Sequence, residues 1–253
     1  MALPDDIRML RDRALVDLNA AYDYYSHTKI AWGIVRQSVS AGHTFALKTI
    51  PEVAIGLEPA TDGANSPVLD ISETGTKTTE AMLAAKARDY TEVQLPEATF
   101  QQFVSILEAF LTDFLRYWLL AYPESLSRRQ VEFKAILEAT DKDAITRFVV
   151  DTQLNEVTYK SPHDWFKYLD ERAKLGVPAD EEVNRFSEAK ASRDVLVHNG
   201  GIANRIYESK AGRLARYQPG ERIEIPGDYH KATWKLIRKI VSDISEAATQ
   251  KLS

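Results

Sequence analysis

The feature that most constrains the fold is an apolar segment at residues 97–121. Large apolar side chains recur in it so densely that they nearly surround a helix: Phe103, Ile106, Leu107, Phe110, Leu111, Phe114, Leu115 and Trp118. A helix that is apolar on almost every side must be deeply buried. Pro96 stands at its start and Pro123 lies beyond its end, as helix boundaries favour. The sequence therefore predicts a buried helix over residues 97–121.

Most of the remaining chain also has helical periodicity. Residues 5–42 carry an apolar stripe at three- and four-residue steps. A single helix and two helices separated near Gly33 are both compatible with it. Further helices are expected at residues 78–90, 127–139, 141–158, 162–175 and 180–198, and from 228 to the end of the chain. Residues 202–227 show no single periodicity, and a turn is expected at Pro219-Gly220.

One stretch, about residues 43–77, departs from this pattern. Proline and glycine punctuate it repeatedly, which is typical of a long surface connection. Two short apolar pieces, at 44–47 and 53–55, are compatible with a small hairpin. The predicted fold is therefore all-α, with an N-terminal helical extension and this irregular excursion (1–95) followed by a helical domain (96–253). One continuous domain is the alternative.

Composition narrows the classes of function. The chain contains no cysteine, which excludes disulfides, zinc–thiolate sites and cysteine nucleophiles and fits a cytoplasmic protein. No run of 18 apolar residues exists, so no membrane span is expected. The net charge is −5, whereas proteins that coat nucleic acid indiscriminately are usually basic. Any contact with nucleic acid must therefore be made by a local patch.

The segment at residues 190–204 is not explained as a solvated helix face. Arg193 and His198 stand five residues apart, near the predicted end of the helix at 180–198. On an ideal helix this offset puts them about 140° apart, with a rise of about 7.5 Å. A site that uses both residues therefore needs a loosened helix end, a curling arginine or a second copy of the chain. Asp194 lies four residues before His198, so it shares a face with the imidazole and is placed to orient it.

Arginine and histidine without metal ligands suit the cleavage of RNA by its own 2′-hydroxyl. Histidine supplies the base for the attack and the acid for the leaving 5′-oxygen. A guanidinium stabilises the phosphorane through paired hydrogen bonds. No cluster of Asp, Glu and His with metal-ligand spacing is recognisable, so no metal and no cofactor is expected. The competing explanation is structural, because an Arg and a His at a helix end can simply cap carbonyls and pair with Asp194.

The context of these residues resembles the HEPN superfamily, and more closely its bacterial RiboL-PSP-like branch. The signature of that family is an Arg, often followed by Asn, Asp or His, and then a His after four to six residues. The matching stretch here is Ala191-Ser192-Arg193-Asp194-Val195-Leu196-Val197-His198-Asn199-Gly200-Gly201, followed by Asn204 and Tyr207. Four residues separate Arg193 from His198. The resemblance covers residues 97–252.

The resemblance implies a helical bundle that forms a homodimer across the motif helix, so that two motifs build one cleft. It implies a metal-independent endoribonuclease that acts in toxin–antitoxin or antiviral (anti-phage) defence, with an antitoxin or defence-complex partner. Arg193 and His198 would be catalytic, and Asp194 and Asn199 would support them. Family members that are inactive scaffolds give the alternative, which is a non-catalytic module that binds RNA, a nucleotide or a protein partner.

A basic segment follows the motif. Residues 205–222 contain several Arg and Lys residues but few Asp or Glu residues, and tyrosines lie between the basic residues. This pattern is compatible with phosphate contacts and base stacking. The RNA-binding candidates are Arg205, Tyr207, Lys210, Arg213, Arg216 and Tyr217. A solvated loop that leads into the last helix explains the same residues equally well.

Overall fold

The structure, a computed structural model, describes residues 3–40, 80–126, 130, 136 and 139–253. These residues are almost entirely helical. No strand occurs among them, and the only extended pairing is an isolated antiparallel bridge between Ile202 and Arg222. The prediction of an all-α fold is confirmed. The irregular excursion and hairpin expected at 43–77, and most of the helix expected at 127–139, lie outside the described residues.

The helices follow the sequence periodicity closely from residue 141 onward. Their order along the chain is α1 (Leu3–Ser40), α2 (Glu80–Asp89), α3 (Leu95–Ala121), α5 (Lys142–Thr158), α6 (Pro162–Ala173), α7 (Asp180–His198), α8 (Arg205–Ala211) and α9 (Gly227–Lys251). Short 3-10 turns occupy Pro123–Leu126 and Gly212–Leu214. The mixed segment at 202–227 thus contains α8, one 3-10 turn and the isolated bridge.

Two helix boundaries differ from the simplest expectation. α1 runs without a break through Gly33, because a single glycine costs a helix only about 1 kcal/mol and does not forbid it. A π-helical turn at Tyr90–Gln94 joins α2 to α3, so the helical backbone passes through Pro96. Pro96 lies in the first turn of α3, where its missing N–H is best tolerated.

The described chain divides into two compact units. The first consists of residues 1–21 with 99–253, and the second consists of residues 22–98. The division drawn from the sequence placed residues 1–21 in the N-terminal part, whereas their contacts place them with the C-terminal part. Leu18 illustrates this packing, since its carbonyl accepts a hydrogen bond from Trp234 Nε1 of α9 at 3.2 Å.

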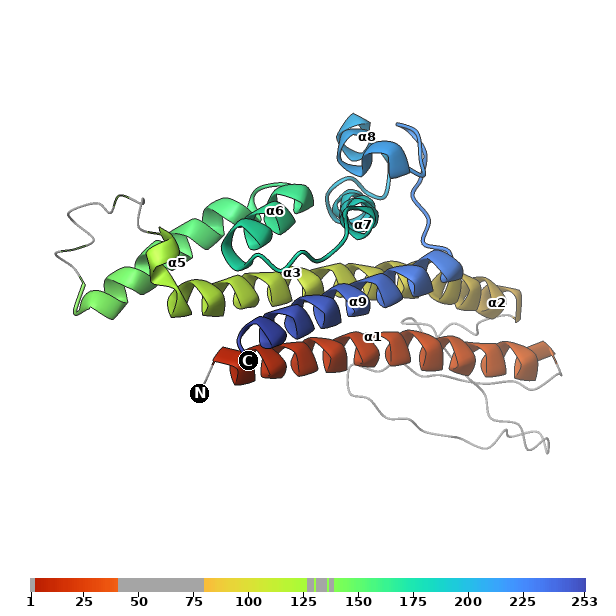
Figure 1. Cartoon of the computed structure of the whole chain (residues 1–253). Coiled ribbons are helices and arrows are strands. Elements are labelled where there is room, and N and C mark those ends of the chain that lie inside the picture. Colours follow the sequence, from red (N-terminus) through yellow and green to blue (C-terminus); the bar gives the residue numbers. More distant parts are fainter. Residues whose placement is uncertain (1–2, 41–79, 127–129, 131–135, 137–138) are drawn as a thin grey trace. The chain divides into compact units, whose positions relative to one another are not determined.

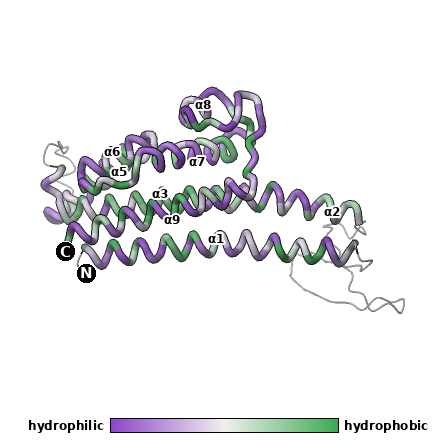
Figure 2. The backbone as a smooth tube through the Cα atoms, turned by 45° about the vertical axis from the view of Figure 1, so that its right-hand side comes forward, coloured by the Kyte–Doolittle hydropathy of each residue, from purple (hydrophilic) through white to green (hydrophobic). Residues whose placement is uncertain are grey.

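The first unit has its core on α3 and α9, which run side by side in both ribbon views (Figures 1 and 2). Green and purple alternate along α9 in Figure 2, as an amphipathic helix requires. Phe103, Leu107 and Phe114 of α3 and Ile237, Ile240 and Ile244 of α9 are fully buried. The prediction that the 97–121 segment is buried is therefore confirmed.

The remaining helices of this unit carry the candidate site. α7 contacts α6, α8 and α9, and α5 contacts α6. α6 starts at a complete capping box, in which Ser161 Oγ accepts a hydrogen bond from the Asp164 amide and the Asp164 carboxylate accepts one from the Ser161 amide. This box fixes the first turn of α6, where Trp165 lies.

The second unit consists of the C-terminal part of α1, α2, the π-helical turn and the start of α3. Its described packing includes an edge-on contact between Trp32 and Tyr90, with 5.4 Å between ring centroids. Lys29 lies over the ring of Tyr25 in the same unit. None of the predicted site residues belongs to this unit.

Candidate active site

A pocket of about 490 Å³ lies in the first unit and gathers the motif residues. It is lined by Glu108, Leu111, Thr112 and Leu115 of α3, Leu154, Val157 and Thr158 of α5, Trp165 of α6, Lys190, Arg193, Asp194 and His198 of α7, and Lys210 of α8. Arg193, Asp194 and His198 thus share one pocket within a single chain. Arg193 and His198 therefore border the same hollow, although an ideal helix places them about 140° apart.

Arg193 is held by two carboxylates. Its guanidinium donates a hydrogen bond to Glu108 of α3 and pairs with Asp194 at 3.3 Å. The Arg193 side chain is only 15% exposed, so these pairs are shielded from solvent. Its Nε–H is buried and has no hydrogen-bond partner among the described residues. The guanidinium is therefore fixed in place while part of its donor capacity remains unused.

The Asp194 carboxylate binds cations and does not orient the imidazole. It accepts hydrogen bonds from Lys190 at 3.2 and 3.3 Å and from Lys210 at 3.5 Å, in addition to its pair with Arg193. No hydrogen bond between Asp194 and His198 exists in this part of the structure. The prediction that Asp194 fixes the imidazole is wrong for this conformation, because three cations occupy the carboxylate.

His198 is the last residue of α7 and is solvent-exposed. Within the described ranges its ring makes no hydrogen bond, so both nitrogens are open to a ligand in the pocket. Buried aliphatic groups line the pocket beside it, among them Leu154, which is 2% exposed. An accessible imidazole and a fixed guanidinium on one hollow are the two groups that metal-free phosphodiester cleavage requires.

Asn199 does not line the pocket. It is the C-cap residue of α7, and its side-chain amide donates a hydrogen bond to the Ile202 carbonyl at 2.5 Å. Gly200 and Gly201 follow with φ of 59° and 79°, a left-handed backbone that L-residues rarely adopt. Asn199 is a helix terminator, which fixes the position at which His198 leaves the helix, and its supporting role in the site stays a prediction.

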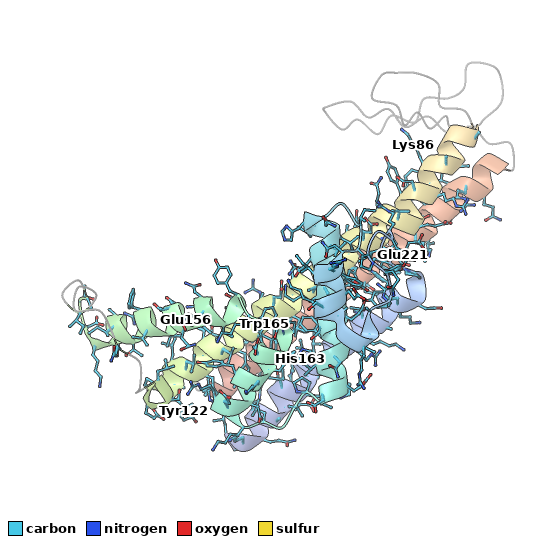
Figure 3. The ribbon with its side chains drawn as sticks, turned by 90° about the horizontal axis from the view of Figure 1, so that it is seen from above. Lys86, Tyr122, Glu156, His163, Trp165 and Glu221 are labelled. Carbon is cyan, nitrogen blue, oxygen red and sulfur yellow. The ribbon has the colours of Figure 1, made fainter. Side chains whose placement is uncertain are left out.

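The sequence reasoning missed several pocket residues, among them Glu108, Lys190 and Trp165. Glu108 lies on an otherwise apolar stretch of α3, and Lys190 pairs with it at 3.0 Å. Trp165, labelled in Figure 3, lies in the first turn of α6. It is 7% exposed, yet it lines the pocket and carries the Lys190 ammonium 5.4 Å from its ring centroid. An acidic residue inside the otherwise apolar run at residues 106–111 was the one available signal for Glu108.

A second polar cluster lies on another side of α7, around the buried carboxylate of Glu188. Its Oε1 accepts hydrogen bonds from Ser192 (2.8 Å), Tyr207 (3.0 Å) and Arg216 (3.0 Å), and its Oε2 accepts one from Tyr229 (2.5 Å). The guanidinium of Arg216 also stacks on the Tyr229 ring, 3.5 Å from its centroid. This network joins α7 to α8, to the segment before α9 and to α9 itself.

The network raises the pKa values of two phenols. Burial, and next the nearby charge of Glu188, raise the pKa of Tyr207 above its ordinary value of 10.0. The same two causes, in the same order, raise the pKa of Tyr229 well above that value. Both phenols therefore stay protonated and donate to Glu188 at neutral pH.

The six predicted RNA-binding residues fall into two groups. In the first group Tyr207 is buried, at 1% exposure, and Arg216 and Tyr217 are partly buried. The Tyr217 hydroxyl donates to the Glu224 carbonyl at 3.0 Å. The prediction that Tyr207 stacks on a base is corrected, because neither face of its ring is accessible. Arg205, Lys210 and Arg213 are exposed. Of the six, only Lys210 lines the pocket, and Arg213 pairs with Glu181 at 2.8 Å.

Two further properties concern the described residues as a whole. They contain no group of three or more His, Asp or Glu side chains that could hold a metal ion. None of their helices combines the length and the apolar character needed to cross a bilayer. Comparison of the chain with protein-family models, with curated proteins and with solved structures gave no match in any of the three. The candidate site is therefore argued from its own geometry.

Proposed function

We propose that this protein is a metal-independent endoribonuclease of the HEPN type, with RNA as its substrate. The observation that carries the proposal is the convergence of Arg193, Asp194 and His198 on one pocket of about 490 Å³. A structural role for Arg193 and His198 as caps would not require both side chains to border a common hollow. The HEPN-like motif in the sequence supports the same assignment.

The cleavage can be written for these residues. His198 removes the proton from a ribose 2′-hydroxyl, whose oxygen attacks the adjacent phosphorus. The bond from phosphorus to the 5′-oxygen breaks, that oxygen takes up the proton that the His198 imidazole has accepted, and a 2′,3′-cyclic phosphate remains. Arg193 donates to the phosphate oxygens as negative charge accumulates on them. Glu108 and Asp194 hold the guanidinium in position and act as positioning residues.

We further propose that the enzyme acts as a homodimer through the region of the motif helix. Val197, Ile202 and Ile206 are large apolar residues next to His198 in sequence, and they are 48%, 39% and 64% exposed. Apolar residues exposed together beside a functional residue are typical of an interaction surface. A cytoplasmic toxin or antiviral defence protein held in check by an antitoxin or defence-complex partner is the biological setting that the resemblance suggests.

The decisive experiment compares His198→Ala with His27→Ala. His27 is an exposed helical histidine on α1 that lies outside the pocket. Total cellular RNA is incubated with each protein in EDTA, and the ends of the products are analysed. Wild type and His27→Ala should produce fragments with cyclic-phosphate ends, and His198→Ala should lose at least about a hundredfold in rate, the usual contribution of a general acid or base. Full activity of His198→Ala would exclude the proposed mechanism.

A second candidate function is a non-catalytic module that binds RNA, a nucleotide or a protein partner. The observation that favours it is the neutralisation of Arg193 and Lys190 by Glu108 and Asp194. If Arg193 keeps its pairs with Glu108 and Asp194 when a ligand binds, its guanidinium does not stabilise charge on the phosphate. The protein would then bind the ligand without cleaving it. Absence of cyclic-phosphate products from wild type, together with retained RNA binding, would select this alternative.

A further inference from the structure

A second hollow, of about 220 Å³, lies between the N-terminal half of α1 and the middle of α3, within the first unit. α1 borders it with Leu10, Arg13 and Asp17, which stand three and four residues apart and therefore share one face of the helix. α3 borders it with Ser105 and Ala109, which are exposed and have small side chains. Small side chains let another helix approach α3 closely. We call this hollow and its two rims the α1–α3 groove.

Exposed apolar residues continue the α1–α3 groove along the surface of α1. Met9 and Val16 are 53% and 64% exposed, and they stand seven residues apart, beside the face that borders the hollow. Leu10 and Ile106, which border the hollow itself, are only partly buried. A single exposed valine or methionine needs no explanation. Four accessible apolar side chains around one hollow are typical of an interaction surface.

The charges around the α1–α3 groove are mainly negative. Asp17 and Asp113 border the hollow, and Asp6 lies on the same face of α1, one turn before Leu10. Among the described residues that border the hollow, the one cation is Arg13, whose guanidinium lies 4.0 Å from the Asp17 carboxylate. Asp6 and Asp113 form no ion pair with any residue that the structure describes. The groove therefore has two negative charges in excess.

These features restrict what can occupy the α1–α3 groove. Its volume of about 220 Å³ is below the usual range of small-molecule sites. The excess of carboxylates repels a nucleic acid and an anionic membrane surface. A second copy of the chain, packed on this face about a twofold axis, would place the same carboxylates against one another. The matching occupant is a different protein that presents apolar side chains between positive charges.

The length of the α1–α3 groove suits a helix. Asp6 and Asp17 stand 11 residues apart, which corresponds to about 16 Å, or three helical turns, along α1. A helix bound in a groove contacts it through apolar residues at three- and four-residue spacing. We propose that the α1–α3 groove binds an amphipathic helix of a partner protein, about three turns long, with Lys or Arg on both sides of its apolar stripe. The groove is separate from the pocket at Arg193, and the proposal does not depend on the nuclease function.

A library of synthetic helical peptides tests this proposal. Each peptide has about 18 residues, which is long enough for a helix to form in water. The peptides share a leucine stripe, and the positions beside it vary among Lys, Glu and Gln. Peptides are selected for binding to the full-length protein and are then sequenced. The selected peptides should contain more Lys than Glu beside the stripe, and added salt should weaken their binding.

Two matched variants of α3 locate the surface that binds the peptides. Ala109 and Ala121 are both exposed alanines of α3, and of the two only Ala109 borders the hollow. Ala109→Arg places a long cationic side chain in the α1–α3 groove, whereas Ala121→Arg adds the same charge elsewhere on the helix. Ala109→Arg should bind the selected peptides at least about tenfold more weakly than wild type, because it fills the groove and repels their lysines. Ala121→Arg should bind them as tightly as wild type does.

Asp113→Asn tests the charge without adding bulk. It should weaken binding of the selected peptides about threefold, the usual effect of losing one exposed ion pair. Asp143→Asn, which removes a charge from an exposed residue of α5, should leave their affinity unchanged. The proposal is overturned if no peptide is selected, if the selected peptides lack an excess of Lys, or if Ala109→Arg binds them as tightly as wild type. An equal effect of Asp113→Asn and Asp143→Asn would also overturn it.

Discussion

At the scale of single residues, the Glu188 network shows how a buried charge is made tolerable. A carboxylate out of reach of water costs several kcal/mol unless it is paired and its lone pairs are used. Here an arginine, a serine and two tyrosines donate to it. Because three of these donors, Tyr207, Arg216 and Tyr229, come from parts of the chain outside α7, the carboxylate stabilises the arrangement of these parts around its own helix.

This network predicts that stability depends on pH in the alkaline range. The raised pKa values of Tyr207 and Tyr229 mean that the unfolded chain loses its phenolic protons first, starting near the ordinary value of 10.0. The folded state then binds more protons, so the free energy of unfolding falls as pH rises above that value, by about 1.4 kcal/mol per pH unit for each tyrosine. Urea unfolding between about pH 9 and 11 measures this slope.

Tyr229→Phe should make that slope shallower, because it removes one of the two groups. Tyr159→Phe is the matched control, since Tyr159 is 92% exposed and its hydroxyl makes no hydrogen bond to any residue that the structure describes. If Tyr229→Phe and Tyr159→Phe gave the same slope as wild type, the network would not be the cause of the pH dependence.

At the scale of the helices, the site depends on how each helix begins and ends. The Asn199-Gly200-Gly201 turn ends α7 at His198, and the capping box at Ser161 starts the helix that supplies Trp165. The first of these signals is local, because an Asn followed by two glycines is typical of a helix C-terminus. Short polar motifs at helix ends thus position pocket residues that belong to different helices.

The cap of α6 gives a prediction at this scale. Ser161→Ala should lower the free energy of unfolding by about 1 kcal/mol, because the Asp164 amide loses its acceptor. Ser105→Ala is the control: Ser105 is exposed within α3, where its hydroxyl donates to the Gln101 carbonyl and alanine favours the helix. Urea denaturation of both variants distinguishes a cap from an ordinary serine, and an equal effect of the two would show that the box contributes nothing.

At the scale of the whole molecule, oligomeric state is the property most open to measurement. The proposed dimer predicts that Ile206→Glu is monomeric, because a charge would then be buried in an apolar contact. Val16→Glu is the matched control, since Val16 and Ile206 are both 64% exposed. Sedimentation of wild type and Val16→Glu should give a dimer and that of Ile206→Glu a monomer. A monomeric wild type, or a dimeric Ile206→Glu, would contradict the proposed interface.

The sequence by itself determined the class of the fold and the place of the motif. Helical periodicity is a local property, so the buried helix at 97–121, the helices α5, α6, α7 and α9, and the end of α7 at His198 were all predictable, whereas α8 was not. Turn residues are equally local, which is why Asn199-Gly200-Gly201 identified the end of the motif helix.

Only the tertiary structure decided what each polar residue contacts. Glu108 stands 85 residues before Arg193, and no local pattern connects them. The basic segment after the motif divided into the buried Tyr207, the partly buried Arg216 and surface residues such as Arg213. Tyr207 is buried because α8 packs on α7, and Arg216 is held by its ion pair with Glu188. Contacts between distant segments depend on how helices pack, and the period of a single helix contains no information about its partners.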